Sequence, residues 1–306
     1  MAHGGDQPLG SRTGSGQALG TQPCGQALLH LAGTVGTVGL EVVHDSVASR
    51  LAGGRQGAVC PKGSVPLCNG MARKQTPLWR ALRIALTVMV VLVAVPVVLT
   101  PVYLVVNPVS VPMLERYVTG RPVDREWRSI EDISDRLKAA VILSEDGQFC
   151  RHWGVDVGAL REEVRDLLAG RDVRGASTIT MQVARNLFLT NAPSYLRKAA
   201  EIPLAVYIDL VMPKRRIMEI YLNIAEWGPE GQFGVAAGAR RAFGIAPQNL
   251  DWRTAALLAA ALPNPMLRTP AEPTANMSRV AGIIAERAQQ YGQRASCVGE
   301  GGKLAL

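Results

Sequence analysis

The sequence predicts a mainly α-helical domain of ordinary size that follows a single membrane-spanning helix. Two observations lead to this prediction. Residues 84–106 form an uninterrupted run without a charged side chain. Residues 111–306 repeat apolar positions every three or four residues, with little of the two-residue alternation typical of strands. A segment of that length is enough for one domain with its own hydrophobic core.

Residues 1–70 precede these features and are rich in Gly, Ala, Ser and Gln, without sustained periodicity. Met71 then opens a basic segment, residues 71–83 (MARKQTPLWRALR), that leads directly into the apolar run. We therefore interpret residues 1–70 as a disordered extension or as the result of a mis-assigned translation start. A flexible cytoplasmic tail is the alternative.

The apolar run at residues 84–106 is long enough to cross the ~30 Å hydrocarbon core of a bilayer. Its two prolines, Pro96 and Pro101, are tolerated better in membrane helices than in soluble ones. The basic residues that precede the run, with no acid between them, are Arg73, Lys74, Arg80 and Arg83. This charge asymmetry predicts a cytoplasmic N-terminus and a domain on the outer side of the membrane. No convincing small-residue cleavage site follows, so we expect an uncleaved anchor rather than a signal peptide.

The formal net charge of +8 fits a nucleic acid, a membrane surface or an anionic substrate. Aromatic residues make up only 5% of the chain and interleave with no basic run, so nucleic-acid binding is not favoured. The five cysteines show neither CxxC nor Cys/His metal spacing. Of the five, Cys150 and Cys297 fall in the domain. We expect two free thiols there, with a disulfide as the alternative.

A candidate catalytic carboxylate lies in residues 134–154 (SDRLKAAVILSEDGQFCRHWG). Leu137, Val141 and Glu145 are four residues apart, so on a helix ending at Asp146 and Gly147 they share one stripe. An acid on a buried stripe is costly unless it is paired or protonated, and its pKa should be raised. Such a carboxyl can exchange protons near neutral pH. The alternative is a last helical turn that has reached solvent, which makes Glu145 a surface acid.

The next predicted helix (STITMQVARNLFL) begins at Ser177 and Thr178, which can cap it. Its buried stripe is expected to consist of Ile179, Val183 and Leu187. On another face lie Gln182, Arg185 and Asn186, one guanidinium and two amides that suit an oxyanion-rich ligand such as a pyrophosphate. A solvated polar face is the alternative.

Arg197 and Glu201 are one turn apart on a predicted helix, so the simplest interpretation is an ion pair. The functional alternative makes Glu201 the second carboxylate of a glycosyl-transfer site, with Arg197 or Lys198 as phosphate partners. The other helices are expected at residues 155–168, 214–225, 254–262 and 280–291. We assign residues 111–295 to the domain and residues 296–306 to a C-terminal tail.

Four sequence blocks stand in a specific order: EDGQFCRHWG, GASTITMQVARN, RKAAE and KRRIMEIYLN, with a weaker RVAGII after them. Together they resemble the peptidoglycan glycosyltransferases (glycosyltransferase family 51), specifically the membrane-anchored monofunctional biosynthetic transglycosylases. The same domain forms the first half of class A penicillin-binding proteins. The resemblance covers residues 134 to about 290, and the order and spacing of the blocks make it specific.

The resemblance implies a mainly α-helical, lysozyme-like head with a smaller membrane-proximal jaw lobe, to which residues 155–175 contribute. It implies that Glu145 is the catalytic base and that Glu201 assists departure of the lipid pyrophosphate or holds a divalent metal. The residues that match substrate-binding positions are Asp146, Phe149, His152, Ser177, Thr178, Gln182, Arg185, Asn186, Arg197 and Lys198. A further matching motif, with Glu219, Tyr221 and Asn223, we regard as mainly structural.

The chain departs from the family pattern at two places. Met181 replaces a common Gln, and Ile245 stands where the family has a Lys after Phe243 and Gly244. We therefore assign no ligand contact to Ile245.

The implied activity is cell-wall biosynthesis, in which lipid II, a disaccharide-pentapeptide on an undecaprenyl pyrophosphate, is polymerised. The resemblance implies inversion at the anomeric carbon and release of undecaprenyl pyrophosphate. The implied location is the bacterial cytoplasmic (inner) membrane, crossed once, with the catalytic domain in the periplasm. The expected partners are lipid II, the growing glycan chain and the membrane, together with cell-division or penicillin-binding proteins, but no nucleic acid. The only cofactor considered is a divalent cation, Mg²⁺ or Mn²⁺.

Two other functions compete with this interpretation. A lysozyme-like lytic enzyme would also use one buried Glu, but it would not need the basic face around Arg185 and Arg197. A membrane-anchored division scaffold would keep the fold without the activity. Transpeptidase activity is not expected, because the chain contains no SxxK motif and Lys62-Gly63-Ser64 lies before the apolar run.

Overall fold

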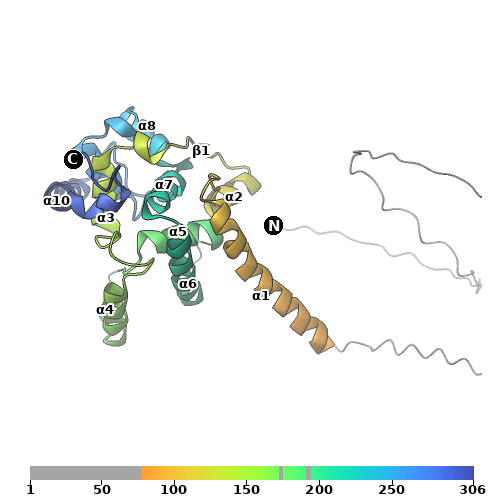
Figure 1. The fold of residues 1–306 in the computed structure, drawn as a ribbon. Coiled ribbons are helices and arrows are strands. Elements are labelled where there is room, and N and C mark those ends of the chain that lie inside the picture. Colours follow the sequence, from red (N-terminus) through yellow and green to blue (C-terminus); the bar gives the residue numbers. More distant parts are fainter. Residues whose placement is uncertain (1–76, 172–174, 191–193) are drawn as a thin grey trace, which may run out of the picture. The chain divides into compact units, whose positions relative to one another are not determined.

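The structure is a computed structural model that describes residues 77–171, 175–190 and 194–306 (Figure 1). The predicted extension at residues 1–70 and the start of the basic segment lie outside the described residues. The chain is mostly helical, as predicted. The α-helices are α1 (Pro77–Val102), α2 (Val111–Val118), α3 (Asp135–Glu145), α4 (Val157–Leu168), α5 (Ile179–Phe188), α6 (Tyr195–Val211), α7 (Lys214–Ile224), α8 (Val235–Phe243), α9 (Trp252–Ala261) and α10 (Ala275–Tyr291).

Helix α1 is, by length and composition, a candidate membrane span. It covers most of the predicted run but begins seven residues before it and ends four residues before its end. Nearly all of its apolar side chains are exposed. Near its C-terminal end it meets α6, where the Tyr207 hydroxyl donates a hydrogen bond of 2.9 Å to the Val97 carbonyl. Just beyond α1, the Arg216 guanidinium donates to the Tyr103 carbonyl, also at 2.9 Å.

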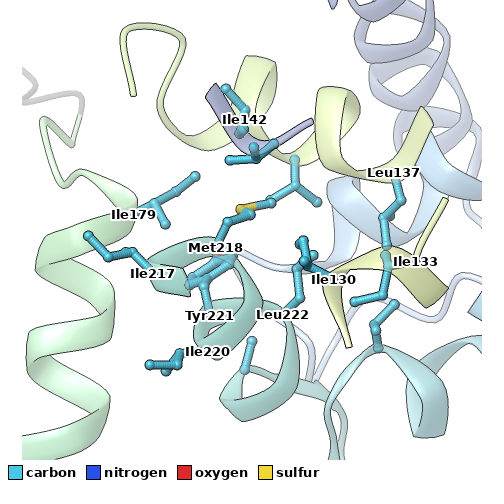
Figure 2. Packing of buried hydrophobic residues seen from close by; sticks show 14 of the residues in the cluster. Ile130, Ile133, Leu137, Ile142, Ile179, Ile217, Met218, Ile220, Tyr221 and Leu222 are labelled. Carbon is cyan, nitrogen blue, oxygen red and sulfur yellow. The ribbon is translucent and has the colours of Figure 1, made fainter. Parts of the chain in front are cut away.

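The main hydrophobic core is formed around α7, which buries side chains on several of its faces (Figure 2). Its buried side chains, from Ile217 to Ile224, require other elements to pack around this part of the helix. Leu137 and Ile142 of α3, Ile179 of α5 and Met218 of α7 contribute side chains to this core. The C-terminal end of α3 and the N-terminal end of α5 therefore pack on the same hydrophobic core.

A small three-stranded sheet accompanies the helices, and the sequence did not predict it. Its strands are β1 (Asp124–Arg125), β2 (Glu226–Gly228) and β3 (Gln232–Phe233), in the order β1-β3-β2. Strand β1 pairs parallel to β3, and β2 pairs antiparallel to it. Strands of two or three residues are too short for alternation to be visible in a sequence. Helix α8 follows directly and packs on β2.

The prediction that residues 296–306 form a tail is wrong. The 3₁₀ segment Gly292–Val298 packs against α3, and the side chains of Val298 and Leu304 are buried. The Ala305 amide donates a 2.6 Å hydrogen bond to Oδ2 of Asp135, at the start of α3. This segment covers part of α3 that would otherwise face water, which explains why it is folded.

The expectation of two free thiols is also corrected. Cys150 and Cys297 form a disulfide, with their Cα atoms 5.7 Å apart. The packing of the C-terminal segment on α3 brings Cys297 to the loop that follows Glu145. Because 147 residues separate the two cysteines, no local spacing pattern predicts their pairing. The bond fixes the C-terminal segment to the loop next to the candidate base.

We predict that Cys297→Ser lowers the free energy of unfolding by about 2–5 kcal/mol, because the unfolded chain regains the freedom of a long closed loop. Denaturant unfolding of the full chain in detergent measures this difference. Ser296→Ala, one residue away, serves as the control and should unfold near the wild-type midpoint. A Cys297→Ser protein as stable as the oxidised wild type would contradict the prediction.

Candidate active site

Glu145 is the last residue of α3 and is partly buried. Val141 and Leu137, one and two turns before it on the same stripe, are fully buried, as predicted. Burial raises the pKa of the Glu145 carboxyl, while a hydrogen bond from Gln182 and the positive charges of Arg268 and Arg185 oppose that rise. The geometry therefore matches a partly desolvated carboxyl rather than an ordinary surface acid.

Two hydrogen bonds orient this carboxyl. Nε2 of Gln182 donates to Oε2 of Glu145 at 3.0 Å, and the Tyr221 hydroxyl donates to Oε1 of Gln182 at 3.1 Å. Burial, together with the negative charge of Glu145, raises the pKa of Tyr221 well above 10, so its hydroxyl remains a donor at any working pH. Because Oε1 of the amide accepts from Tyr221, its NH₂ group must face Glu145. The series Tyr221–Gln182–Glu145 thus joins α7, α5 and α3.

Asp146 and His152 were predicted to bind substrate, but the structure places them in internal hydrogen bonds. The Asp146 carboxylate lies 2.9 Å from Nε2 of His152 and accepts a 3.0 Å bond from the Ile179 amide. A carboxylate at the N-terminus of a helix such as α5 is favoured by the helix dipole. These two side chains position the loop after Glu145 against α5.

Thr178 has a similar positioning role. Its Oγ1 accepts from the Met181 amide at 3.1 Å, which caps α5 as predicted. Its hydroxyl donates to the Gly154 carbonyl at 2.6 Å. Gly154 has φ +78°, and a Cβ there would lie 2.3 Å from the Ala205 carbonyl oxygen, so only glycine allows the loop to approach α6 so closely. Ser177, next to the cap, is half-buried.

Phe149 differs most from its predicted role. Its side chain is fully buried in the core, so the structure gives it no surface for a substrate. The Lys214 ammonium lies 4.4 Å from the centre of its ring and 2.6 Å from Oδ2 of Asp209. The ring therefore packs the loop after Glu145 onto the core beside Lys214.

The polar face predicted on α5 lines a pocket of about 290 Å³. Gln182, Arg185 and Asn186 are half-buried there, beside Tyr221, whereas the stripe of Ile179, Val183 and Leu187 is buried in the core. The opposite walls come from Pro112, Ile224, Ala225, Glu226, Phe233, Leu262, Pro263, Pro265 and Met266. The face is therefore the half-buried wall of a pocket rather than a fully solvated surface.

Glu201, the predicted second carboxylate, is only 2% exposed and forms an ion pair with Arg197. Burial raises its pKa, and the charges of Arg197, Arg185 and Lys198 oppose the rise. Arg185 therefore acts on both Glu145 and Glu201, so it lies within electrostatic reach of the two carboxyls. The simple ion-pair interpretation is confirmed, and it does not exclude the functional one.

Lys198 pairs with Glu163 of α4. The same carboxylate accepts a 3.3 Å hydrogen bond from the Ala176 amide, so Glu163 links α4, α6 and the segment before α5. A role for Lys198 at a phosphate stays a prediction.

The described residues hold no group of three His, Cys, Asp or Glu side chains that could bind a metal ion. The Glu201 carboxylate, for which the resemblance gives metal binding as one of two alternative roles, is paired with Arg197. The residues present therefore do not fit a dedicated divalent-cation site, and we derive no chemical step through one.

Two residues of this site were missed by sequence reasoning. Tyr221 was grouped with structural residues, although a buried Tyr needs a hydrogen-bond partner and its buried position four residues after Ile217 was visible. Arg268 lies outside every predicted helix, where no pattern indicates its place. Its Nη1 donates to the Ala260 carbonyl at 2.6 Å, and its charge acts on Glu145.

The elements that carry this site, from α3 to α7, lie within residues 113–289, which match the transglycosylase family profile. The chain belongs to the transglycosylase family. Three similar proteins bear the name "Biosynthetic peptidoglycan transglycosylase". The Mesorhizobium japonicum protein is 50% identical over 232 residues, which are 75% of this chain and 97% of the relative. The Brucella suis protein is 51% identical over 70% of this chain and 96% of its own length. The Rhodopseudomonas palustris protein is 49% identical over 69% of this chain and 89% of its own length.

We predict that Tyr221→Phe shifts the acid limb of the transglycosylase pH–rate profile to higher pH. Without the hydroxyl, the Gln182 amide is less firmly oriented, and its hydrogen bond holds down the pKa of Glu145. A higher pKa leaves less of the ionised base at a given pH. Tyr117→Phe, on an exposed side chain of α2, is the control. An unchanged profile would show that Tyr221 only fills space.

Proposed function

We propose that this transglycosylase is a peptidoglycan glycosyltransferase that polymerises lipid II into glycan strands, with inversion at the anomeric carbon and release of undecaprenyl pyrophosphate. The observation that carries the proposal is the partly buried Glu145, oriented by Gln182 beside the pocket that Arg185 lines. The names of the similar proteins support it.

In the proposed step, ionised Glu145 accepts the proton of the acceptor sugar's 4-hydroxyl. The hydroxyl oxygen forms a bond to the anomeric carbon of the growing chain. The bond from that carbon to the lipid pyrophosphate breaks on the opposite face, which inverts the configuration. The hydrogen bond from Gln182 holds one carboxyl oxygen of Glu145. Its second oxygen has no hydrogen bond among the described residues and is free to meet the hydroxyl.

Departure of the pyrophosphate requires positive charge where negative charge develops. Arg185 lines the pocket and acts electrostatically on both carboxyls. We assign it to the donor's phosphates. Arg197, paired with Glu201, would stabilise the leaving group further if the pyrophosphate draws its guanidinium away from that carboxylate.

The proposed location is the outer side of the bacterial cytoplasmic membrane, with α1 as the anchor and the N-terminus in the cytoplasm. Apolar side chains on α4 and at the start of α6, including Leu168 and Leu196, are exposed. Such residues suit contact with lipid, and they keep the site near a lipid-linked substrate. We include α4 in the proposed jaw lobe.

Incubation of the purified protein with lipid II, followed by gel analysis of glycan chains, tests this function. A lytic enzyme would shorten added glycan strands, and an inactive scaffold would do neither. A labelled β-lactam should not attach covalently, because the chain has no SxxK nucleophile.

We predict that Glu145→Gln lowers the polymerisation rate by at least about a hundredfold, because the base is lost. Stability should stay level or rise. The pKa of Glu145 is about 4.3 in the unfolded chain and higher in the folded protein. As the pH rises, the unfolded chain therefore releases this proton first, and stability falls. At neutral pH the ionised Glu145 side chain thus lowers the free energy of unfolding. Glu201→Gln is the comparison and should lose less rate. Near-normal elongation by Glu145→Gln would exclude the mechanism.

We predict that Arg185→Ala reduces turnover about tenfold or more, because a charge-assisted contact to phosphate is lost. The thermal midpoint should stay close to wild type, since the side chain lies on the pocket face and not in the core. Arg279→Ala, on the exposed side of α10, controls for the loss of one positive charge. If folding declines in parallel with activity, Arg185 is a structural residue.

A further inference from the structure

A second pocket, of about 270 Å³, lies between β2, α8 and the segment after α9. We call it the β2–α8 pocket and define it by Trp227, Gly238, Arg241, Arg268 and Glu272, which are among its lining residues. Neither the family resemblance nor the mechanism above assigns it a role.

The β2–α8 pocket adjoins the active-site pocket at two points of the chain. Glu226 lines the active-site pocket, and the next residue, Trp227, lines the β2–α8 pocket. Likewise Met266 lines the first and Arg268, two residues later, lines the second. The two pockets are therefore lined by the same two segments of the chain.

The charge of the β2–α8 pocket is positive. It contains the guanidinium groups of Arg241 and Arg268 against the single carboxylate of Glu272. Arg241 has a contact with Glu230, but at 3.4 Å between exposed groups it is weak. Arg268, which lines this pocket, also lowers the pKa of Glu145 through its positive charge.

The shape of the pocket follows from how α8 packs on β2. A Cβ on Gly238 would lie 2.6 Å from the Cβ of Trp227, so α8 approaches β2 closely. Arg241 is one turn after Gly238 on the same face of α8. The neighbouring Arg240 faces elsewhere and binds Asp124 at 2.9 Å and Glu126 at 2.8 Å.

The ligand class follows from the two guanidinium groups of the β2–α8 pocket. Trp227 lines the pocket but is only 3% exposed, so it contributes mainly apolar wall. The planar guanidinium groups of Arg241 and Arg268 match the two oxygens of a carboxylate. The pocket therefore favours a carboxylate.

We propose that the β2–α8 pocket binds a carboxylate of the peptide carried by the acceptor glycan, with Arg241 and Arg268 as its partners. This inference rests on the proposed function, in which the substrate is a disaccharide with an attached peptide. The pyrophosphate is assigned to Arg185, so the peptide carboxylates are the remaining negative charges of that substrate. Binding beside Arg268 would place the acceptor sugar next to Glu145.

Calorimetric binding to the full chain in detergent tests the proposal, with two water-soluble probes. One is a disaccharide–peptide fragment with free carboxylates, and the other is the same fragment with every carboxylate amidated. The wild-type protein should bind the acidic probe about tenfold more tightly than the amidated one. Arg241→Gln should abolish that preference. The matched control Arg240→Gln removes the same charge from the same helix and should retain the preference.

Equal affinity of the wild type for both probes, or no binding of the acidic probe, would contradict the proposal that this pocket binds a carboxylate. The proposal is also contradicted if Arg240→Gln loses the preference for the acidic probe as fully as Arg241→Gln does. That result would show a general effect of positive charge. Gel analysis of lipid II polymerisation by the same wild-type preparation judges the proposed function separately. If the preparation polymerises lipid II but binds both probes equally, the proposed function is retained and only the carboxylate site in the β2–α8 pocket is rejected.

Discussion

The hydrogen bond between Gln182 and Glu145 is the contact on which the arrangement of the active site depends. It joins the end of α3 to the pocket face of α5, and Tyr221 fixes its direction from within the core. The carboxyl can stay partly buried because it retains this donor and two guanidinium charges nearby. Burial makes the carboxylate a stronger base, and these contacts limit the rise in its pKa so that it can still ionise, which is what a proton acceptor requires.

Around this contact, one set of residues holds the surrounding segments in place and another set faces the pocket. Asp146, His152 and Thr178 close a set of bonds among the loop after Glu145, the N-terminus of α5 and Gly154. The buried side chain of Phe149 packs the loop after Glu145 into the hydrophobic core. Because these groups satisfy one another, Arg185 and Asn186 are left to face the pocket. Several residues of this motif thus have a supporting role that their internal hydrogen bonds and burial make visible.

The helical elements and Glu145 could be predicted from the sequence, because their signals are local: a stripe repeating every four residues, a cap, an apolar run. The polar face on α5 was predicted for the same reason. Phe149 was misjudged, since a motif match does not distinguish a ring that supports a site from one that lines it. The sheet, the Cys150–Cys297 disulfide and the place of Arg268 depend on contacts between distant segments, for which one sequence offers no period or spacing.

The dependence of α3 on residues 292–306 has a consequence for biogenesis. The helix that carries Glu145 is made early in the domain, yet its cover and the cysteine that secures its loop are made more than a hundred residues later. If the domain lies on the outer side of the membrane, as proposed, the site would reach its final form only after this late segment has been translocated and oxidised. The transglycosylase would then be unable to begin work while its own chain is still crossing the bilayer.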